Sequence, residues 1–260
     1  MILAQRIRRM TGGHWLAFFG LVLASWAALY AMQLPPELAA AADLYGAGFW
    51  AALCTVAPGA AGFPALFAMW AAMAAAMMAP TALPALATYE ELPLPGEAGG
   101  QGFLALLAGY LAVWLGFAAA AAAMQITLAT AGLVTPAGDS ASAALNAVLL
   151  ALAGGYQFTA LKEACLSKCR HPLGFFMQHW RPGRRAALAL GLRLGLVCLG
   201  CCWALMALAF VGGTMNLAWM GLATLVMVLE KLPEIGRPVT RPLGVLLLAA
   251  AAAFAISGLA

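Results

Sequence analysis

The chain has 260 residues, of which 65% are apolar and only 8% are charged. Its mean hydropathy is +0.94. A soluble globular domain contains about 45–50% apolar and about 25% charged residues, so this chain has too few polar residues to cover a water-facing surface. The composition excludes soluble enzyme folds, basic nucleic-acid-binding domains and disordered chains, and it predicts an all-α integral membrane protein.

Seven apolar stretches are long enough for transmembrane helices, each of which needs about 20 mostly apolar residues. The first follows three arginines, as a signal peptide would, but its length of about 20 residues exceeds a usual signal-peptide core and favours a retained helix. The predicted spans are 15–34, 63–83, 103–128, 141–161, 186–211, 215–229 and 243–259. We therefore expect a polytopic bundle of about seven spans, forming one domain over residues 15–260 after a basic cytoplasmic segment, 1–14.

The basic residues indicate how the bundle is oriented. Every Lys and Arg except Arg193 lies in one of three segments, 1–14, 162–185 and 231–241. Lys and Arg are in excess in cytoplasmic loops, and a seven-span chain with a cytoplasmic N-terminus and an outside C-terminus places all three segments in the cytoplasm. The expected location is a bacterial inner membrane, with the lipid bilayer as the main partner and no nucleic acid.

Two cysteines, Cys165 and Cys169, lie at the cytoplasmic end of the fourth predicted span. If the helix continues, their i, i+4 spacing places them on one face. Lys162, Lys168 and Arg170 lie nearby, and cations favour the thiolate, which is the nucleophilic and metal-binding form. The alternative is that both cysteines pack as small apolar residues at the membrane interface.

A second group of sulfurs lies near the middle of the fifth predicted span. Cys198, Cys201 and Cys202 stand at i, i+3 and i+4, so one helix face carries all three thiols, here named the cysteine triad. Met206 continues the row formed by Cys198 and Cys202. The triad is a candidate metal site, although Cys is also tolerated in a membrane helix as a small apolar residue.

The third group consists of methionines in the second predicted span. Met69, Met73 and Met77 recur every four residues, so their thioethers follow one helix face up to Pro80, which bends the cytoplasmic end. Thioethers and thiolates together are the soft ligands that select Cu(I). Met is also a common filler of gaps in a core, so packing alone is the alternative interpretation.

Depth in the membrane allows the three groups to meet. The fifth span enters from the cytoplasm near residue 186, so Cys198 is expected about 18 Å into the membrane at 1.5 Å per residue. Met73 and Met77 fall near the same depth on the second span. The Cys165/Cys169 pair is expected below them at the inner boundary, as the cytoplasmic end of a metal route.

The sequence contains no visible catalytic machinery. It has no HExxH, GxSxG or phosphate-loop motif. The three histidines lie at or outside the inner interface, which excludes a bis-histidine haem within the bilayer. Arg193 is a charged residue inside a span and needs a partner, for which Glu230 and Glu163 are the candidates.

Five parts of the chain share a pattern with a known family, namely 73–84, 154–157 with 161–170, 195–206, 215–219 and 230–231. Together they resemble the DUF2182 family, bacterial proteins described as predicted metal-binding integral membrane proteins. The resemblance covers roughly residues 63–237 and implies a membrane fold and metal binding. Many members carry a His where this chain has Leu194, which implies that this chain binds metal with sulfur alone or does not bind it.

These observations favour a non-enzymatic inner-membrane protein that binds a soft metal, with Cu(I) preferred, for transport or delivery to or from a metallochaperone or metalloenzyme. The expected metal ligands are Cys198, Cys201, Cys202, Cys165, Cys169, Met73, Met77 and Met206. Two other classes stay open. One is a membrane thiol–disulfide redox protein, and the other is a structural or assembly subunit without a ligand.

Overall fold

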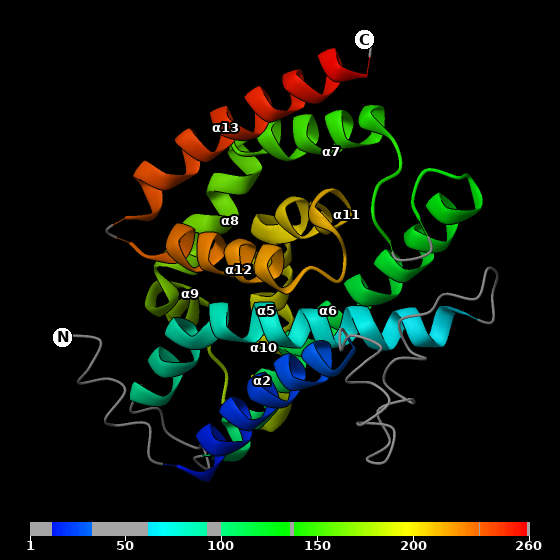
Figure 1. Cartoon of the computed structure of the whole chain (residues 1–260). Helices are drawn as coiled ribbons and strands as arrows, with labels where there is room; N and C mark the ends of the chain where they lie inside the picture. Colours follow the sequence, from blue (N-terminus) through cyan, green and yellow to red (C-terminus); the bar gives the residue numbers. More distant parts are fainter. Residues whose placement is uncertain (1–11, 33–61, 93–99, 136–137, 234, 259–260) are drawn as a thin grey trace.

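The computed structural model describes residues 12–32, 62–92, 100–135, 138–233 and 235–258. The described residues are almost entirely helical (Figure 1), and the predicted all-α fold is confirmed. Most of the basic segment 1–14 and the loop after the first predicted span lie outside these ranges. The helices are α2 (Gly13–Met32), α5 (Phe63–Glu91), α6 (Gly100–Thr130), α7 (Ala143–Tyr156), α8 (Ala160–Arg170), α9 (Pro172–His179), α10 (Arg184–Ala207), α11 (Ala209–Gly212), α12 (Leu217–Lys231) and α13 (Gly236–Ser257).

Five helical stretches of the described chain are long and apolar enough to cross a membrane, namely α2, α5, α6, α10 together with α11, and most of α13. Helices α7 and α8 pass the same test as a pair, but they are bent by 63° between Tyr156 and Ala160. The predicted number of seven spans is therefore not confirmed. The remaining candidate, α12, has 15 residues, fewer than the ~20 that a span needs.

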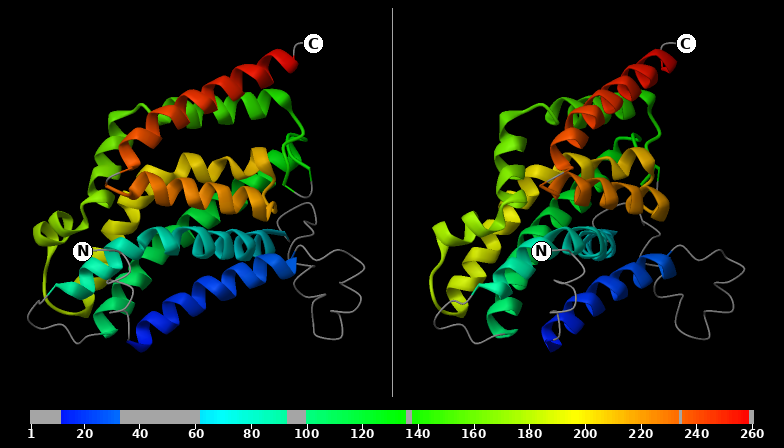
Figure 2. Two further views of the ribbon diagram at one scale, coloured as in Figure 1. Left: turned by 60° about the vertical axis from the view of Figure 1, so that its left-hand side comes forward. Right: turned by 90° about the vertical axis from the view of Figure 1, so that its left-hand side faces the viewer.

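The helices lie in layers. Figures 1 and 2 show α13 alongside α7 at one side of the bundle and α2 at the opposite side. Helices α5, α6, α10, α11 and α12 lie between these outer layers, and α6 packs extensively against both α5 and α10. This central layer contains many buried residues, among them the cysteine triad and the methionines of α5.

Glycines bring α6 and α10 into close contact. A Cβ on Gly109 of α6 would overlap the backbone of Leu188, and a Cβ on Gly191 of α10 would overlap the backbone of Leu106. Small residues of this kind let membrane helices approach until their backbones pack directly. The contact fixes α10, the helix that carries the cysteine triad, against α6.

The bend between α7 and α8 places α8 against α10. The Thr159 side chain accepts a hydrogen bond of 3.2 Å from the backbone N–H of Lys162, which caps the start of α8. The predicted fourth span, 141–161, thus ends where α7 gives way to α8, which runs in a different direction. As a result, the face of α8 that carries Cys165 and Cys169 packs against α10.

A buried ion pair joins α8 to the end of α12. The Lys162 ammonium lies 2.9 Å from Glu230 Oε2, and both side chains are only 1% exposed. Arg170 donates from Nε to the Glu230 carbonyl at 2.9 Å and from its guanidinium to Glu163 at 3.3 Å. The predicted pairing of these carboxylates with Arg193 is wrong, because Glu230 binds Lys162, Glu163 binds Arg170, and Arg193 is exposed.

Candidate metal site

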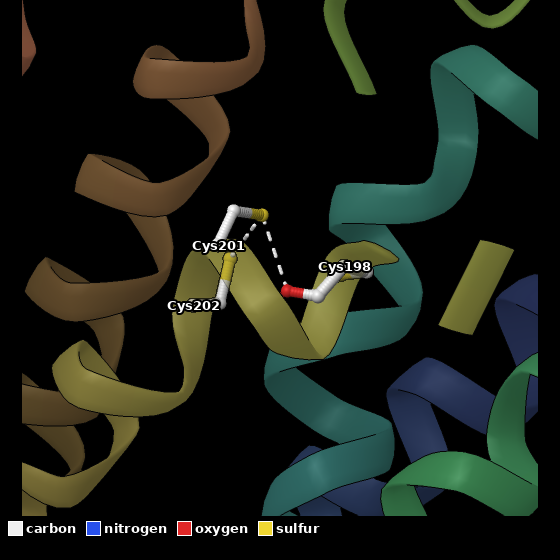
Figure 3. A group of neighbouring side chains, drawn as sticks. All are labelled: Cys198, Cys201 and Cys202. Carbon is white, nitrogen blue, oxygen red and sulfur yellow. Dashed lines mark hydrogen bonds between the residues drawn. The ribbon is translucent and has the colours of Figure 1, made fainter. Parts of the chain in front are cut away.

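The cysteine triad forms one compact, buried group on α10. The three sulfurs lie within 4.8 Å of one another, and each residue is 1% exposed. The Cys201 and Cys202 sulfurs are 3.3 Å apart, and the Cys201 thiol donates to the carbonyl of Cys198 at 3.1 Å (Figure 3). In the described part of the chain, no other group of three His, Cys, Asp or Glu side chains is arranged to hold a metal ion.

The size of the triad suits a single ion. Two sulfurs that each lie about 2.3 Å from one ion, the Zn–S distance, are at most about 4.6 Å apart. The observed separations, all within 4.8 Å, are therefore close to those of a loaded thiolate site. Small side-chain rotations suffice to bring the sulfurs around a metal ion.

Cys169 adds a fourth sulfur from α8. Its Sγ lies 3.9 Å from Cys201 Sγ, and the residue is buried. The expectation that Cys165 and Cys169 share a helix face is consistent with this packing, but the expectation that they lie below the triad is wrong. The 63° bend before α8 turns this helix against α10, so Cys169 lies beside the triad.

Cys165 packs one turn earlier on α8, against Gly200. A Cβ added to Gly200 would lie only 2.7 Å from Cys165 Sγ, so the glycine leaves room for the sulfur. The Tyr156 hydroxyl donates to the carbonyl of Gly200 in the same contact. Cys165 is half-buried and belongs to the wall of the site, while Cys169 is buried next to Cys201.

Three polar residues around Cys198 were not predicted as site residues. The Lys231 ammonium, at the end of α12, donates to Cys198 Sγ at 2.9 Å and to Thr81 Oγ1 at 2.6 Å. The Tyr110 hydroxyl of α6 lies 3.0 Å from the same sulfur and donates to the carbonyl of Met78 at 2.8 Å. The sequence offered one signal for Lys231, namely the pair of charged residues Glu230 and Lys231 at the end of an apolar stretch.

Lys231 supplies a positive charge where a metal–thiolate centre needs one. A buried charge is costly unless it is paired. A Cu(I) ion with two thiolates carries a net charge of −1, and the ammonium of Lys231 balances this charge. Lys231 lies in hydrogen-bond contact with Cys198, close enough to provide this balance.

The methionines are placed along their helices relative to the triad. Thr81, whose hydroxyl is 3.9 Å from Cys198 Sγ, follows Met77 by one helical turn and Met73 by two. At 1.5 Å per residue, Met77 and Met73 lie about 6 and 12 Å from Thr81 along α5. Met206 lies about 6 Å beyond Cys202 on α10, and all three methionines are buried. The contact of α5 with Cys198 Sγ is made by the Thr81 hydroxyl, and the methionines stay predicted ligands.

The comparison with known families was decisive for the class of protein. A family model described as PpoB2, copper chaperone, matches residues 67–254, which include all eight predicted ligands. The chain belongs to this family. The match confirms a copper-related membrane family and does not carry the DUF2182 name. No curated protein and no solved structure matches the chain.

Proposed function

We propose that this copper-chaperone family member binds Cu(I) in the membrane through Cys198, Cys201 and Cys202, with Cys169 as the fourth sulfur. The observation that carries the proposal is the buried group of thiols, within 4.8 Å of one another, on a helix fixed by its neighbours. Thiolate ligands without carboxylate favour soft metals over Mn²⁺ or Mg²⁺, and the copper-chaperone family favours Cu(I) over Zn²⁺.

The ion is cargo that the protein receives and passes on. A chaperone must release its metal. At this site the ammonium of Lys231 is hydrogen-bonded to Cys198, and thiolates can exchange around Cu(I) without a change in its oxidation state. The buried methionines Met73, Met77 and Met206 supply weaker soft ligands on the central helices. They offer Cu(I) a path from the triad through the bundle, in a bacterial inner membrane, toward a metalloenzyme or metallochaperone partner.

The test is the copper content of the detergent-purified protein under reducing conditions. We expect the wild-type protein to bind Cu(I) and the triple variant Cys198→Ser, Cys201→Ser, Cys202→Ser to lose most of this capacity. Cys165→Ser is the matched control, because Cys165 packs against Gly200 in the wall of the site, outside the triad. Circular dichroism and size-exclusion chromatography check that the variants keep their helices and remain dispersed.

A thiol–disulfide function is the second candidate, and one distance favours it. Cys169 and Cys201 are 3.9 Å apart, sulfur to sulfur, so a modest movement could bring them to the ~2.05 Å of a disulfide bond. Mass spectrometry of protein from freshly lysed cells distinguishes the candidates, since copper handling requires free thiols and a redox function requires a reversible Cys169–Cys201 bond.

A further inference from the structure

The bend between α7 and α8 borders a pocket that the proposed metal site does not use. The pocket has a volume of about 920 Å³ and is lined by the bend, by Glu163 of α8 and by the first turns of α13. Helices α7 and α13 lie side by side in opposite directions (Figure 1), because Gly154 packs against Gly244 and Ala143 packs against Gly258. The pocket therefore lies at one end of this helix pair. On the orientation that the basic residues predict, that end is at the cytoplasmic surface of the membrane.

Gln157 is buried at this pocket with an unpartnered side-chain amide. The residue directly follows α7, lines the pocket and is only 5% exposed. Neither its amide oxygen nor its amide nitrogen has a hydrogen-bond partner among the residues that the structure describes. Buried polar groups are nearly always hydrogen-bonded, so an exception indicates a partner from outside the chain. An amide contains both a donor and an acceptor, and a ligand with both kinds of group would satisfy it.

The two walls of the pocket are fixed to each other. Arg170 donates one hydrogen bond of 3.3 Å to Glu163 on α8 and another of 3.3 Å to Thr240 on α13, and both of these residues line the pocket. Gly244 brings α13 close to the bend, since a Cβ added to it would lie only 2.8 Å from Gln157 Cβ. The pocket is thus formed by helices that are held in place by their own contacts, as a binding site requires.

The pocket carries one unsatisfied group of each charge. The Arg241 side chain lines it, is exposed, and makes no hydrogen bond or ion pair with any residue in the described part of the chain. Glu163 binds Arg170 through Oε1, and its side chain is 54% exposed, so Oε2 can accept a further hydrogen bond. A simple anion would meet the carboxylate of Glu163, and a simple cation would meet the guanidinium of Arg241. A zwitterion satisfies both groups.

We propose that this pocket binds the phosphoethanolamine group of a phospholipid, with the phosphate at Arg241 and the primary ammonium between Glu163 and the Gln157 amide oxygen. The amide nitrogen of Gln157 donates to the phosphate. A lipid is the source that fits the location, because the pocket lies at the membrane surface and the neighbouring side chains of Phe158 and Leu161 are 50% and 61% exposed, as lipid-facing groups are. The volume of about 920 Å³ lies within the range of about 300–1,000 Å³ for small-ligand pockets. The inference does not depend on copper binding.

The first experiment compares lipids on the delipidated wild-type protein in detergent. Bound lipid is counted by native mass spectrometry, and the melting temperature is measured at each lipid concentration. Phosphatidylcholine with the same acyl chains is the control for phosphatidylethanolamine, because it keeps the phosphate and the positive charge but has no N–H donor. A hydrogen bond to a charged group contributes enough free energy for about a 10-fold change in affinity or more, so we expect phosphatidylethanolamine to bind tighter by at least this factor. Soluble glycerophosphoethanolamine tests the headgroup without its acyl chains, and it should bind more weakly than the lipid.

The second experiment changes the pocket. Arg241→Gln and Gln157→Leu should each lower the affinity for phosphatidylethanolamine by about 10-fold or more. Without lipid, Gln157→Leu should melt at the wild-type temperature or above it, because the change replaces a buried, unpartnered amide by an apolar side chain. The matched controls are Arg181→Gln, which removes an exposed positive charge outside the pocket, and Asn146→Leu, which removes a buried, unpartnered amide oxygen on α7. Both controls should keep the wild-type affinity for the lipid.

Three results would overturn the inference. Equal affinities for phosphatidylethanolamine and phosphatidylcholine would mean that the pocket does not bind an ammonium group. Equal affinities for the lipid and for glycerophosphoethanolamine would mean that the occupant is a soluble molecule. A melting temperature of Gln157→Leu that falls below that of the wild-type protein in the absence of lipid would mean that water or the protein already satisfies the amide. All these measurements are made without copper, so none of the three results bears on the proposed function.

Discussion

Cys169 Sγ lies 3.9 Å from Cys201 Sγ, although the two residues are 32 positions apart and belong to different helices. The contact joins α8 to the triad-bearing helix α10. The group of thiols on α10 thereby gains a fourth sulfur from α8. Metal binding at this site would therefore tie α8 to α10, and the two proposals for the thiols give different outcomes at Cys169.

We expect Cys169→Ser to lower the affinity for Cu(I) more than Cys165→Ser does. Cys169 is buried and within reach of Cys201, whereas Cys165 packs on Gly200 at the wall. Mutation of a residue that only hydrogen-bonds to a metal ligand typically lowers metal affinity by about 10–100-fold. Loss of the sulfur ligand itself should lower the affinity by at least about 10-fold. Chelator competition measures both variants, and equal effects would exclude Cys169 as a ligand.

The pH dependence of copper binding should report on Lys231. Thiols must lose their protons to bind metal, so protons compete with Cu(I), and affinity rises as the pH rises. The ammonium next to Cys198 stabilises its thiolate relative to its thiol, so we expect copper binding to release fewer protons from the wild-type protein than from Lys231→Met. Lys231→Met leaves Cys198 as a thiol, and binding then releases one more proton.

The measurement is the slope of log affinity against pH, which increases by about one for each additional proton released. We expect a steeper slope for Lys231→Met than for the wild-type protein, and the wild-type slope for Lys231→Arg. Identical slopes for all three proteins would show that Lys231 does not set the protonation of Cys198. Calorimetry in buffers with different ionisation enthalpies gives the same proton count independently.

Local periodicity accounts for what the sequence predicted about the site. The i, i+3, i+4 spacing of the triad places three thiols on one helix face in any α-helix, and the structure keeps them together. The neighbours of Cys198 depend on tertiary packing instead. Lys231 is 33 positions away from Cys198 and Tyr110 is 88, and no spacing rule connects residues at such separations.

The break between α7 and α8 shows a second limit. Gly154 and Gly155 stand just before the break, but the apolar stretch continues past them, and the sequence therefore predicts one span over 141–161. The helix stops where Thr159 caps the following helix, and Thr is a weak signal inside an apolar stretch. The predicted depth of Cys169 was wrong for this reason, because depth was counted along a straight helix.

The buried pair Lys162–Glu230 should be essential for stability. Both side chains are 1% exposed and 2.9 Å apart, and removal of one partner from such a pair costs about 3–5 kcal/mol, because it leaves an uncompensated charge. We expect Lys162→Met and Glu230→Gln each to lower the melting temperature in detergent strongly. The double variant should be less destabilised than the sum of the two single changes.

Lys168→Met is the control for this series, since Lys168 lies on the same helix and is exposed. Its effect on the melting temperature should be small, because surface substitutions usually stay within about 0.5 kcal/mol. Additive effects of Lys162→Met and Glu230→Gln would mean that the two side chains do not stabilise each other. The contact between α8 and α12 would then depend on Arg170 alone, through its hydrogen bond to the Glu230 carbonyl.

The direction of α12 decides the topology of the C-terminal half. Its 15 residues extend about 22 Å, against a hydrocarbon core of about 30 Å. The C-terminal end of α12 nevertheless lies next to α8, because Glu230 contacts Lys162 and Arg170 there. Helix α12 therefore runs back toward the side on which the basic segment 162–185 lies, as a span would.

Reporter fusions test this arrangement directly. We expect fusions after Gly183 and after Ile235 to report the same, cytoplasmic side, and a fusion after Ser257, at the end of α13, to report the opposite side. The basic residues of 162–185 and 231–241 then share the cytoplasm, as the distribution of Lys and Arg requires. Opposite sides for Gly183 and Ile235 would mean that α12 does not return.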